Sequence, residues 1–487
     1  MSDLLLLIPT AAPLAAAAAH TVLGPRRAGW LAVACSATLL TAAVALAATG
    51  IDSPTRSALG GVLRVDPLAA FLLVIIGVVA LIAAAATPAH LRAEIADGHA
   101  TTVTARRHHV LVDLFLAATT LAVLAADLGV LWVAIEATTI VTAFLVGHRR
   151  TRHGTEAAWK YVVICSTGIA LALLGAIVLA FAAAHAPGAH GLDIAALTAA
   201  AHTLDPDVTR IGVALLVLGF GTKAGLAPLH AWLPDAYSQA PAPVTALMSG
   251  VLGAVAFAAI LRVKVISDAA LGTGFARALL AGMAIVSLLV AASLLLGVTD
   301  YTRMFAYSSI EHLAIAAFGA AVGSPAAVAA VLLHLLGHGI AKSVLFVGAG
   351  RLRLATGTSR IDGVRGLAAS HPVLSGAVGA SVLALVGFPP FSLFASELGI
   401  LRAGFTAGMG VATTIVLTLM LVIAAALTVH TSRMLLGEPT GSRVTRQPAA
   451  VTAAMIGGLV ACAAIGLSIG PLGDLLQAAV TTLTEPR

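Results

Sequence analysis

A few ionisable residues of this chain lie inside long apolar runs, where a charge is costly. Only four of its 27 basic residues are lysines, and Lys160, Lys223 and Lys342 lie within or beside apolar sequence. Lysine loses its proton more readily than arginine when it is removed from water. Ionisable groups in such surroundings are functional candidates, so these lysines predict movement of charge across a bilayer.

A second chemical pattern is a row of titratable side chains. His334, His338 and Lys342 recur at intervals of four residues, which places them on one face of a helix. Such a row suits proton relay, because histidine changes its charge near neutral pH. Two other interpretations remain open from the sequence: axial haem ligation, which needs matching histidines on another helix, and simple hydrogen bonding between helices.

Glu136 lies in the middle of the apolar stretch GVLWVAIEATTIVTAFLVG and has no basic neighbour in sequence. An unpaired carboxylate there is either protonated or matched by a lysine on another helix. Lys223 is the natural partner, so we expect an ion pair at mid-membrane depth, with a purely structural role as the alternative. Asp113 stays open between function and packing, and Glu311 and His312 are further polar groups in or near apolar sequence.

The elements that must position these residues are membrane helices. The chain is 60% hydrophobic and 10% charged, whereas soluble domains have about a quarter charged residues. Its apolar runs are about 20 residues long, which is the length that crosses a hydrocarbon core. We therefore expect an all-α polytopic membrane protein, with residues 1–487 forming a single integral membrane domain of fourteen transmembrane helices. The predicted spans lie near residues 4–23, 28–50, 67–86, 110–126, 128–147, 157–184, 211–240, 243–261, 276–298, 305–322, 326–349, 374–403, 408–430 and 450–470.

Proline interrupts two of these spans. Pro228 and Pro234 lie in the seventh span, and Pro389 and Pro390 lie near the middle of the twelfth. Proline removes a helical hydrogen bond and clashes with the preceding turn. Broken helices are tolerated in membranes where they line a hydrated or protein-buried cavity, so helices 7 and 12 are expected to be unwound there.

Each break has an ionisable residue close by. Lys223 comes five residues before Pro228, and Glu397 comes seven after Pro390. Matched interruptions in two halves of a chain indicate an inverted-repeat transporter. We predict two inverted five-helix repeats, at about 110–262 and 276–430, with helices 1–3 and 14 peripheral to them.

Arginine is concentrated in the odd-numbered predicted loops, for example at Arg149, Arg150 and Arg152. By the positive-inside rule these loops are cytoplasmic, which places both termini on the outer side of a bacterial inner membrane. The net charge of +6 then reflects topology and not nucleic-acid binding. The first apolar run has only Asp3 ahead of it and no basic region, so it is expected to be a helix and not a signal peptide.

The three cysteines, Cys35, Cys165 and Cys462, are isolated in apolar sequence. An iron–sulfur cluster needs four cysteine ligands and a zinc site needs clustered Cys or His. The chain also has no P-loop and no GxGxxG in the required context. We therefore expect it to bind no metal, nucleotide or other cofactor.

A family resemblance rests on longer motifs. The stretch FGTKAGLAPLHAWLPDAYSQAPAPVTALMSG resembles the signature of the proton-translocating antiporter-like subunits of complex I, the Mrp antiporters and membrane-bound hydrogenases. The similarity continues through DYTRMFAYSSIEH and GFPPFSLFASE, so it covers about residues 110–400. WVAIEATTIVTAFLV, APAPVTALMSG and MFAYSSIEH are most similar to the F subunit of hydrogenase-4-type and formate-hydrogenlyase-type complexes.

The resemblance implies a set of proton-translocating residues, carried over from the family's motifs. They are Glu136, Lys160, Lys223, His230, His334, His338, Lys342 and Glu397. Two positions depart from the family: Ala254 stands where many relatives have a lysine on helix 8, and Thr302 where many have a lysine before helix 10. Either water and histidine then connect Lys223 with Lys342, or the subunit pumps weakly.

The resemblance implies an H⁺-translocating membrane subunit of a group 4 hydrogenase-like or complex I-like oxidoreductase, with Na⁺ as the other possible ion. Electron transfer would take place in partner membrane and peripheral subunits, and the chain would not be catalytic by itself. One alternative is a subunit of an Mrp-type cation/proton antiporter with no redox partner. Another is a scaffold that keeps the fold without transport.

Overall fold

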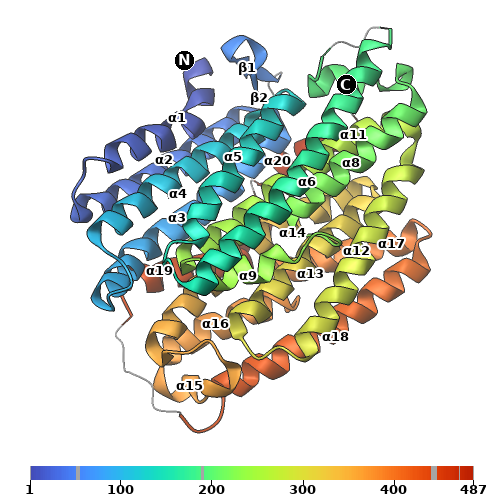
Figure 1. The fold of residues 1–487 in the computed structure, drawn as a ribbon. Helices are drawn as coiled ribbons and strands as arrows, with labels where there is room; N and C mark the ends of the chain where they lie inside the picture. The colour runs from blue at the N-terminus through green and yellow to red at the C-terminus, as the bar shows by residue number, and fades with distance from the viewer. Residues whose placement is uncertain (1, 51–54, 188–190, 440–446, 471, 486–487) are drawn as a thin grey trace.

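The computed structural model describes residues 2–50, 55–187, 191–439, 447–470 and 472–485. This part of the chain is helical almost throughout and forms one bundle of long helices (Figure 1). Eleven helices are long and apolar enough to cross a membrane, and two shorter apolar helices accompany them. The prediction of an all-α polytopic membrane protein is confirmed at this level.

The long and short helices follow one another along the whole chain. They are α1 (Ser2–His20), α2 (Pro25–Gly50), η1 (Leu59–Gly61), α3 (Pro67–Ala96), α4 (Thr102–Leu124), α5 (Leu128–Val146), α6 (Arg152–Ala184), α7 (Ile194–Ala199), η2 (Ala201–Thr203), α8 (Pro206–Ala224), α9 (Trp232–Gln239), α10 (Ala242–Leu247), the π-helical turn η3 (Met248–Leu252), α11 (Gly253–Leu271), α12 (Thr273–Leu296), α13 (Tyr301–Val322), α14 (Pro325–Thr356), η4 (Ile361–Gly363), α15 (Leu367–Ser370), α16 (Pro372–Leu385), α17 (Ser392–Thr406), α18 (Gly410–Leu435), α19 (Ala449–Leu467) and α20 (Leu472–Thr484). Several run beyond the predicted spans, because a helix does not stop where its apolar stretch ends.

Both interruptions expected from proline are present. α8 ends at Ala224, where Gly225 adopts a left-handed conformation with φ 85°, and helix resumes only at Trp232. α16 ends at Leu385 and α17 begins at Ser392. The backbone therefore leaves the helix on both sides of Pro228 and of Pro389.

Helix α3 lies outside both predicted repeats. Most of its length is buried, and it packs against α2, α10, α14, α19 and α20. Its sequence from Pro67 to Ala86 is apolar on every face. A helix without a polar face can pack against either lipid or protein, and the surface of α3 is covered mainly by neighbouring helices.

Close helix crossings position the buried lysine of α8. A Cβ at Gly219 of α8 would lie 2.5 Å from the carbonyl oxygen of Gly168 in α6. Only glycine permits this approach, as is common where membrane helices pack through small residues. Asp127 and Thr151 accept hydrogen bonds from the first turns of α5 and α6 and thereby fix where these two neighbours begin.

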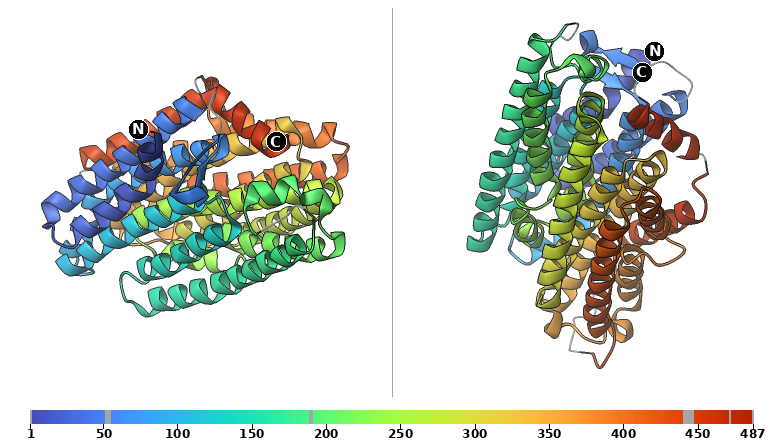
Figure 2. Two further views of the ribbon diagram at one scale, coloured as in Figure 1. Left: turned by 90° about the horizontal axis from the view of Figure 1, so that it is seen from above. Right: turned by 90° about the vertical axis from the view of Figure 1, so that its right-hand side faces the viewer.

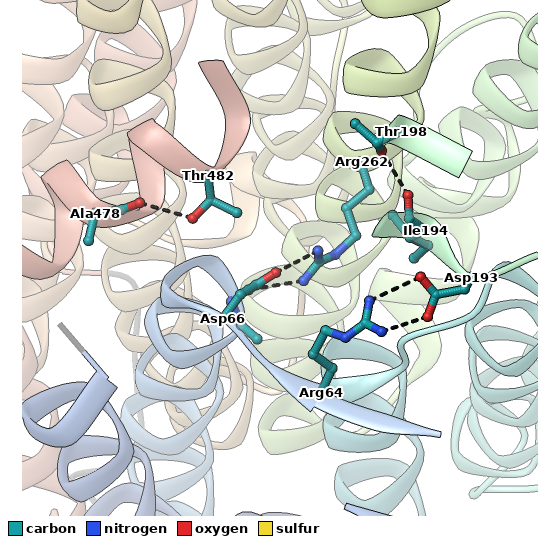
Figure 3. A network of polar contacts seen from close by, with 9 residues as sticks. Arg64, Asp66, Asp193, Ile194, Thr198, Arg262, Ala478 and Thr482 are labelled. Atoms are coloured by element: carbon teal, nitrogen blue, oxygen red, sulfur yellow. Dashed lines mark hydrogen bonds and ion pairs between the residues drawn. The ribbon is translucent and has the colours of Figure 1, made fainter. Parts of the chain in front are cut away.

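One end of the bundle is held by a polar network (Figure 3). The antiparallel hairpin of β1 (Arg56–Ala58) and β2 (Leu63–Val65) precedes α3 there. Arg262 of α11 donates twice to Asp66, at 2.8 and 3.2 Å, and Arg64 donates twice to Asp193, at 2.6 and 3.2 Å. The chain begins and ends at this same end of the bundle (Figures 1 and 2).

Candidate functional site

Lys223 lies at the end of α8 with 1% of its surface exposed. Its Nζ donates to the hydroxyl of Thr139 on α5 and to the hydroxyl of Tyr161 on α6, both at 2.7 Å. A buried ammonium needs hydrogen-bond acceptors. Two neutral hydroxyls provide them here.

The expected ion pair between Glu136 and Lys223 is wrong as a direct contact, since none of the ion pairs among the described residues joins them. Glu136 is half-buried and accepts a hydrogen bond from Ser166 at 3.2 Å. Its second carboxylate oxygen has no hydrogen-bond partner among the residues that the structure describes. The reason lies in the neighbours of the lysine: Thr139, about one turn beyond Glu136, and Tyr161 occupy the positions around Nζ.

Lys160 has a different environment from the other two lysines. Its side chain is 47% exposed, and its Nζ pairs with Glu156 at 2.8 Å and with Asp235 of α9 at 3.0 Å. Asp235 also pairs with Arg303 at the start of α13. Lys160 therefore belongs to a charge cluster that joins α6, α9 and α13. Its apolar sequence context suggested a buried charge, but the side chain is partly exposed.

His230 lies inside the non-helical segment between α8 and α9 and is half-buried. Two bonds hold this segment in place. The Ala227 backbone nitrogen donates to Ser287 of α12 at 2.8 Å, and the Trp232 indole donates to the Thr222 carbonyl at 2.9 Å. The groups freed by the helix break are therefore partly satisfied by side chains.

Lys342 is fully buried in α14, and its Nζ donates to the backbone carbonyl of Phe305 on α13 at 2.8 Å. Ser309 donates to the same carbonyl at 3.3 Å and also shares a hydrogen bond with Ser249 of the π-helical turn η3 at 3.1 Å. Ser249 in turn is adjacent to Tyr237 of α9. Residues 237, 249 and 309 thus connect Lys342 to the first helix break.

For the connection between Lys223 and Lys342 the sequence left two possibilities open, water with histidine or weak pumping. Between these lysines the described residues are aromatic and hydroxyl-bearing: Trp232 makes edge contacts with Tyr161 and Tyr237 at centroid distances of 5.0 and 6.1 Å. The histidines lie on the other side of Lys342. The sequence placed His334 and His338 on one face of α14. It could not show which ionisable group on a neighbouring helix this face contacts.

The histidine group extends from α14 to Glu397. His312 Nδ1 lies 3.3 Å from His334 Nε2 and 3.8 Å from the Glu397 carboxylate. His334 Nδ1 lies 3.1 Å from the hydroxyl of Ser396. The ring of His338 is 5.1 Å from that of His312, which brings all three imidazoles together in the interior.

His312, His334 and Glu397 offer ligand atoms that all lie within 4.8 Å of one another, a spacing that could hold a metal ion. The three residues come from α13, α14 and α17, so no sequence spacing could have indicated such a site. A structural zinc site usually has four ligands, whereas this group has three. The row continues past it to His338 and Lys342, which fits the passage of a proton better than a closed metal site.

Several residues of this arrangement were not predicted as site residues. Asp235, Tyr237, Ser249 and Ser309 all stand inside the quoted family motifs, which was the available signal. Glu311 and His312 stood out as polar groups in apolar sequence but received no role. Glu311 is buried and accepts from Ser308 at 3.3 Å.

The two departures from the family motifs also have definite places. Ala254 is buried in α11, two residues beyond the π-helical turn. Thr302 donates to Asp300 at 2.6 Å at the start of α13. Neither position holds a charge.

Comparison with known proteins gives the family. The family described as "NADH:quinone oxidoreductase/Mrp antiporter, TM" matches residues 125–423. The chain belongs to this family. The matched segment contains both helix breaks, both buried lysines and the whole histidine group, and the expected resemblance is thereby confirmed.

Individual members of this antiporter-like family are similar over most of the chain. The hydrogenase-4 component F homolog of Methylacidiphilum infernorum is 37% identical over 351 residues, covering 72% of this chain and 73% of the relative. NADH-quinone oxidoreductase subunit N of Desulforudis audaxviator is 32% identical over 419 residues, covering 82% and 80%.

Solved structures of low identity show the same fold. A chain of the membrane-bound sulfane sulfur reductase, an archaeal respiratory membrane complex, has a TM-score of 0.88 at 24% identity and covers 99% of this chain and 97% of its own. A chain of the Mrp complex from Dietzia sp. has a TM-score of 0.86 at 22% identity, with coverage of 99% and 98%.

Proposed function

We propose that the chain is the proton-translocating membrane subunit of a hydrogenase-like or complex I-like oxidoreductase. One observation carries the proposal: Ser309 and Lys342 donate to the same Phe305 carbonyl, which joins the hydroxyl-bearing link to the buried lysine. The polar row then runs from Lys223 through Lys342 to the histidine group and Glu397. Such a row across a membrane interior is suited to conduct charge.

The histidine group can pass a proton without leaving a charge behind. His312 can take up a proton at Nε2, which has no partner among the described residues, as it gives the proton on Nδ1 to Nε2 of His334. His334 then releases its own Nδ1 proton to the Ser396 hydroxyl, 3.1 Å away, and the hydroxyl gives up its proton in turn. Glu397, 3.8 Å from His312 Nδ1, is the carboxylate beside this group. Each ring changes only which nitrogen carries hydrogen, as a relay of neutral imidazoles requires.

We propose further that the chain crosses the membrane fourteen times, with α8–α9 and α16–α17 each forming one broken crossing. Residues 110–262 and 276–430 would be two inverted repeats, related by a pseudo-two-fold axis in the membrane plane. The paired interruptions support this count, as does the placement of both ends of the chain at one end of the bundle (Figure 2). Both termini would face outward, because arginine is concentrated at the opposite end.

Partner subunits would supply the driving reaction. The relatives named above are components of hydrogenase-4 and NADH-quinone oxidoreductase. On α5, Val133 and Ile140 flank Glu136 and are 56% and 57% exposed. We infer that this face meets lipid or a neighbouring membrane subunit, and that Glu136 with its unpartnered oxygen is one end of the relay.

The proposal is tested by Lys342→Met in the assembled complex, in sealed vesicles where a dye reports proton movement. Methionine keeps the length and apolar packing of the side chain but cannot titrate. We expect the complex to assemble and translocation to fall at least tenfold. Lys264→Met is the matched control, because Lys264 pairs with Asp268 away from the row and its loss should leave translocation unchanged. A Lys342→Met complex that pumps at the normal rate would contradict the relay.

An Mrp-type cation/proton antiporter is the second candidate, favoured by the fold likeness to the Mrp complex. It predicts cation-driven proton exchange in vesicles that lack any redox subunit. A scaffold without transport predicts that neither Lys342→Met nor Lys223→Met changes translocation by the complex.

A further inference from the structure

A second group of buried titratable side chains lies outside the relay. It contains five histidines and two carboxylates from α1, α3, α4 and the segment after α5, and we call it the N-terminal histidine row. Its members are His20, His90, His108, His109, His148, Glu94 and Asp113. The row lies toward the arginine-rich end of the bundle, which carries the loops at 97–101, 147–151 and 297–300.

The row begins with a buried pair and continues as a chain of rings. His20 Nδ1 lies 2.5 Å from the Asp113 carboxylate, and both side chains are at most 3% exposed. The ring of His20 stacks on that of His109 at 4.8 Å, His109 contacts His108 at 5.9 Å, and His108 contacts His148 at 5.3 Å.

The other end of the row reaches a small cavity. Glu94 pairs with Arg149, the neighbour of His148 in sequence, and lies 3.7 Å from His90. A cavity of about 40 Å³ is lined by His90 and Arg149 together with, among others, Tyr237, Ser238 and Thr245. A water molecule needs only about 10–15 Å³ of such space, so the cavity has room for water.

The hydrogen bonding of the row argues against a purely structural role. His108 is fully buried, and neither of its ring nitrogens has a hydrogen-bond partner among the described residues. Nε2 of His148 is likewise without a hydrogen-bond partner among these residues. Buried polar groups are nearly always bonded, either to protein or to ordered water. An apolar side chain would fill a position that served packing alone without the desolvation cost of an unbonded polar group. We therefore infer that water lies between the rings and bonds to these nitrogens.

We propose that the N-terminal histidine row, with water in the Tyr237 cavity, conducts protons between the surface at the arginine-rich end and the middle of the central relay. This inference rests on the proposed proton translocation. The cavity reaches Tyr237, which is adjacent to Ser249 and so meets the link between Lys223 and Lys342. The row would therefore feed the relay between these two lysines.

Each step moves one proton and leaves no net change on the ring. A ring accepts a proton from water at its free nitrogen and releases the proton held on the other. Burial lowers the pKa of His148 below its usual range, so this ring is neutral at pH 7 and has a free nitrogen for the transfer.

The test is His108→Leu in the assembled complex, measured in sealed vesicles. Because the His108 nitrogens make no hydrogen bond to the described residues, leucine breaks none of the hydrogen bonds seen there. We expect thermal stability of the complex to be unchanged or higher, and the rate of proton translocation to fall at least fivefold. His202→Leu, an exposed histidine at the other end of the bundle, is the matched control and should translocate normally.

The outcomes separate this inference from the proposed function. If His108→Leu pumps at the normal rate while Lys342→Met does not, the row is structural and the central relay stands. If both variants pump normally, the relay itself fails. If His108→Leu does not assemble, His148→Gln decides, since glutamine keeps the polar volume but does not titrate: normal pumping by that variant overturns the row, and a severalfold loss supports it.

Discussion

The Nζ of Lys223 lies 2.7 Å from the hydroxyl of Tyr161, and the carboxylate expected beside it, that of Glu136, bonds to Ser166 instead. Among the described residues, the direct hydrogen-bond partners of the buried ammonium are therefore neutral hydroxyls, and Glu136 is not in contact with it. A carboxylate in contact would hold the proton on the lysine more firmly. The neutral surroundings keep its release accessible, which suits a group that must be loaded and emptied in each cycle.

Replacing Tyr161 by Phe removes one of the two acceptors around Lys223 and leaves the ring. Hydrogen bonds to charged groups contribute about 1.5–3 kcal/mol, so we expect the free energy of unfolding to fall by an amount in this range. Proton translocation by the vesicle-bound complex should fall severalfold. Tyr307→Phe is the matched control, because Tyr307 is half-buried on α13 and its hydroxyl shows no hydrogen bond to the part of the chain that the structure describes. Equal behaviour of the two variants would show that Tyr161 does not support the lysine.

Replacing Arg262 by Ala leaves Asp66 without its bidentate partner at the hairpin end of the bundle (Figure 3). Both side chains are largely buried, at 14% and 11% exposure, so we expect a loss of about 3 kcal/mol in unfolding free energy. This loss is measured by comparing the unfolding of the purified variant and of the unchanged protein in detergent. The exposed pair of Arg210 and Asp207 is the control, and Arg210→Ala should cost less than about 1 kcal/mol.

Acid should weaken the same end of the bundle. Burial alone would raise the pKa of Asp66, but the Arg262 guanidinium outweighs it and holds the pKa below its usual value; Arg64 does the same for Asp193. A lowered folded-state pKa gives stability that is complete above the unfolded value of about 4 and is lost as the pH falls through the folded value. We expect the melting temperature of the protein to decrease when the pH is lowered below about 4. The decrease should be smaller in the Arg262→Ala variant. If the melting temperature of Arg262→Ala decreases in acid as much as that of the unchanged protein, other carboxylates cause the effect.

Replacing Gly466 by Ala should disturb the second helix break. A Cβ at this position of α19 would overlap the Pro390 carbonyl oxygen and lie 2.6 Å from the backbone nitrogen of Ser392. Overpacking of this kind costs about 1–3 kcal/mol, and here it would also displace the segment that leads to Glu397. We expect lower thermal stability and slower translocation. Gly457→Ala on the same helix meets nothing within 4 Å and should be neutral or slightly stabilising.

Much of the site could be predicted from the sequence because its signals are local. The interval of four residues between His334, His338 and Lys342 fixes one helical face whatever surrounds it. Proline at 228 and 389 ends a helix through covalent geometry alone, so both interruptions were predictable. The length and composition of the apolar runs determined the helical membrane class in the same way.

Contacts between helices were decided only by the tertiary structure. Glu136 and Lys223 are on different helices, and the distance between them depends on the rotation of α5 against α8. Tyr161 and Thr139 took the positions around the lysine, and no sequence rule assigns them in advance. The exposure of Lys160 and the central place of α3 depend likewise on which faces the neighbouring helices cover.

The histidine residues show the division most clearly. The sequence by itself determined that His334 and His338 share a face and that several other histidines stand near apolar runs. Only the packing of α13, α14 and α17 brought His312, His334 and Glu397 together, and only the packing of α1, α3 and α4 lined up the N-terminal histidine row. The physical reason is that helical periodicity is a property of a few consecutive residues, whereas a continuous polar path needs side chains from helices far apart in the chain.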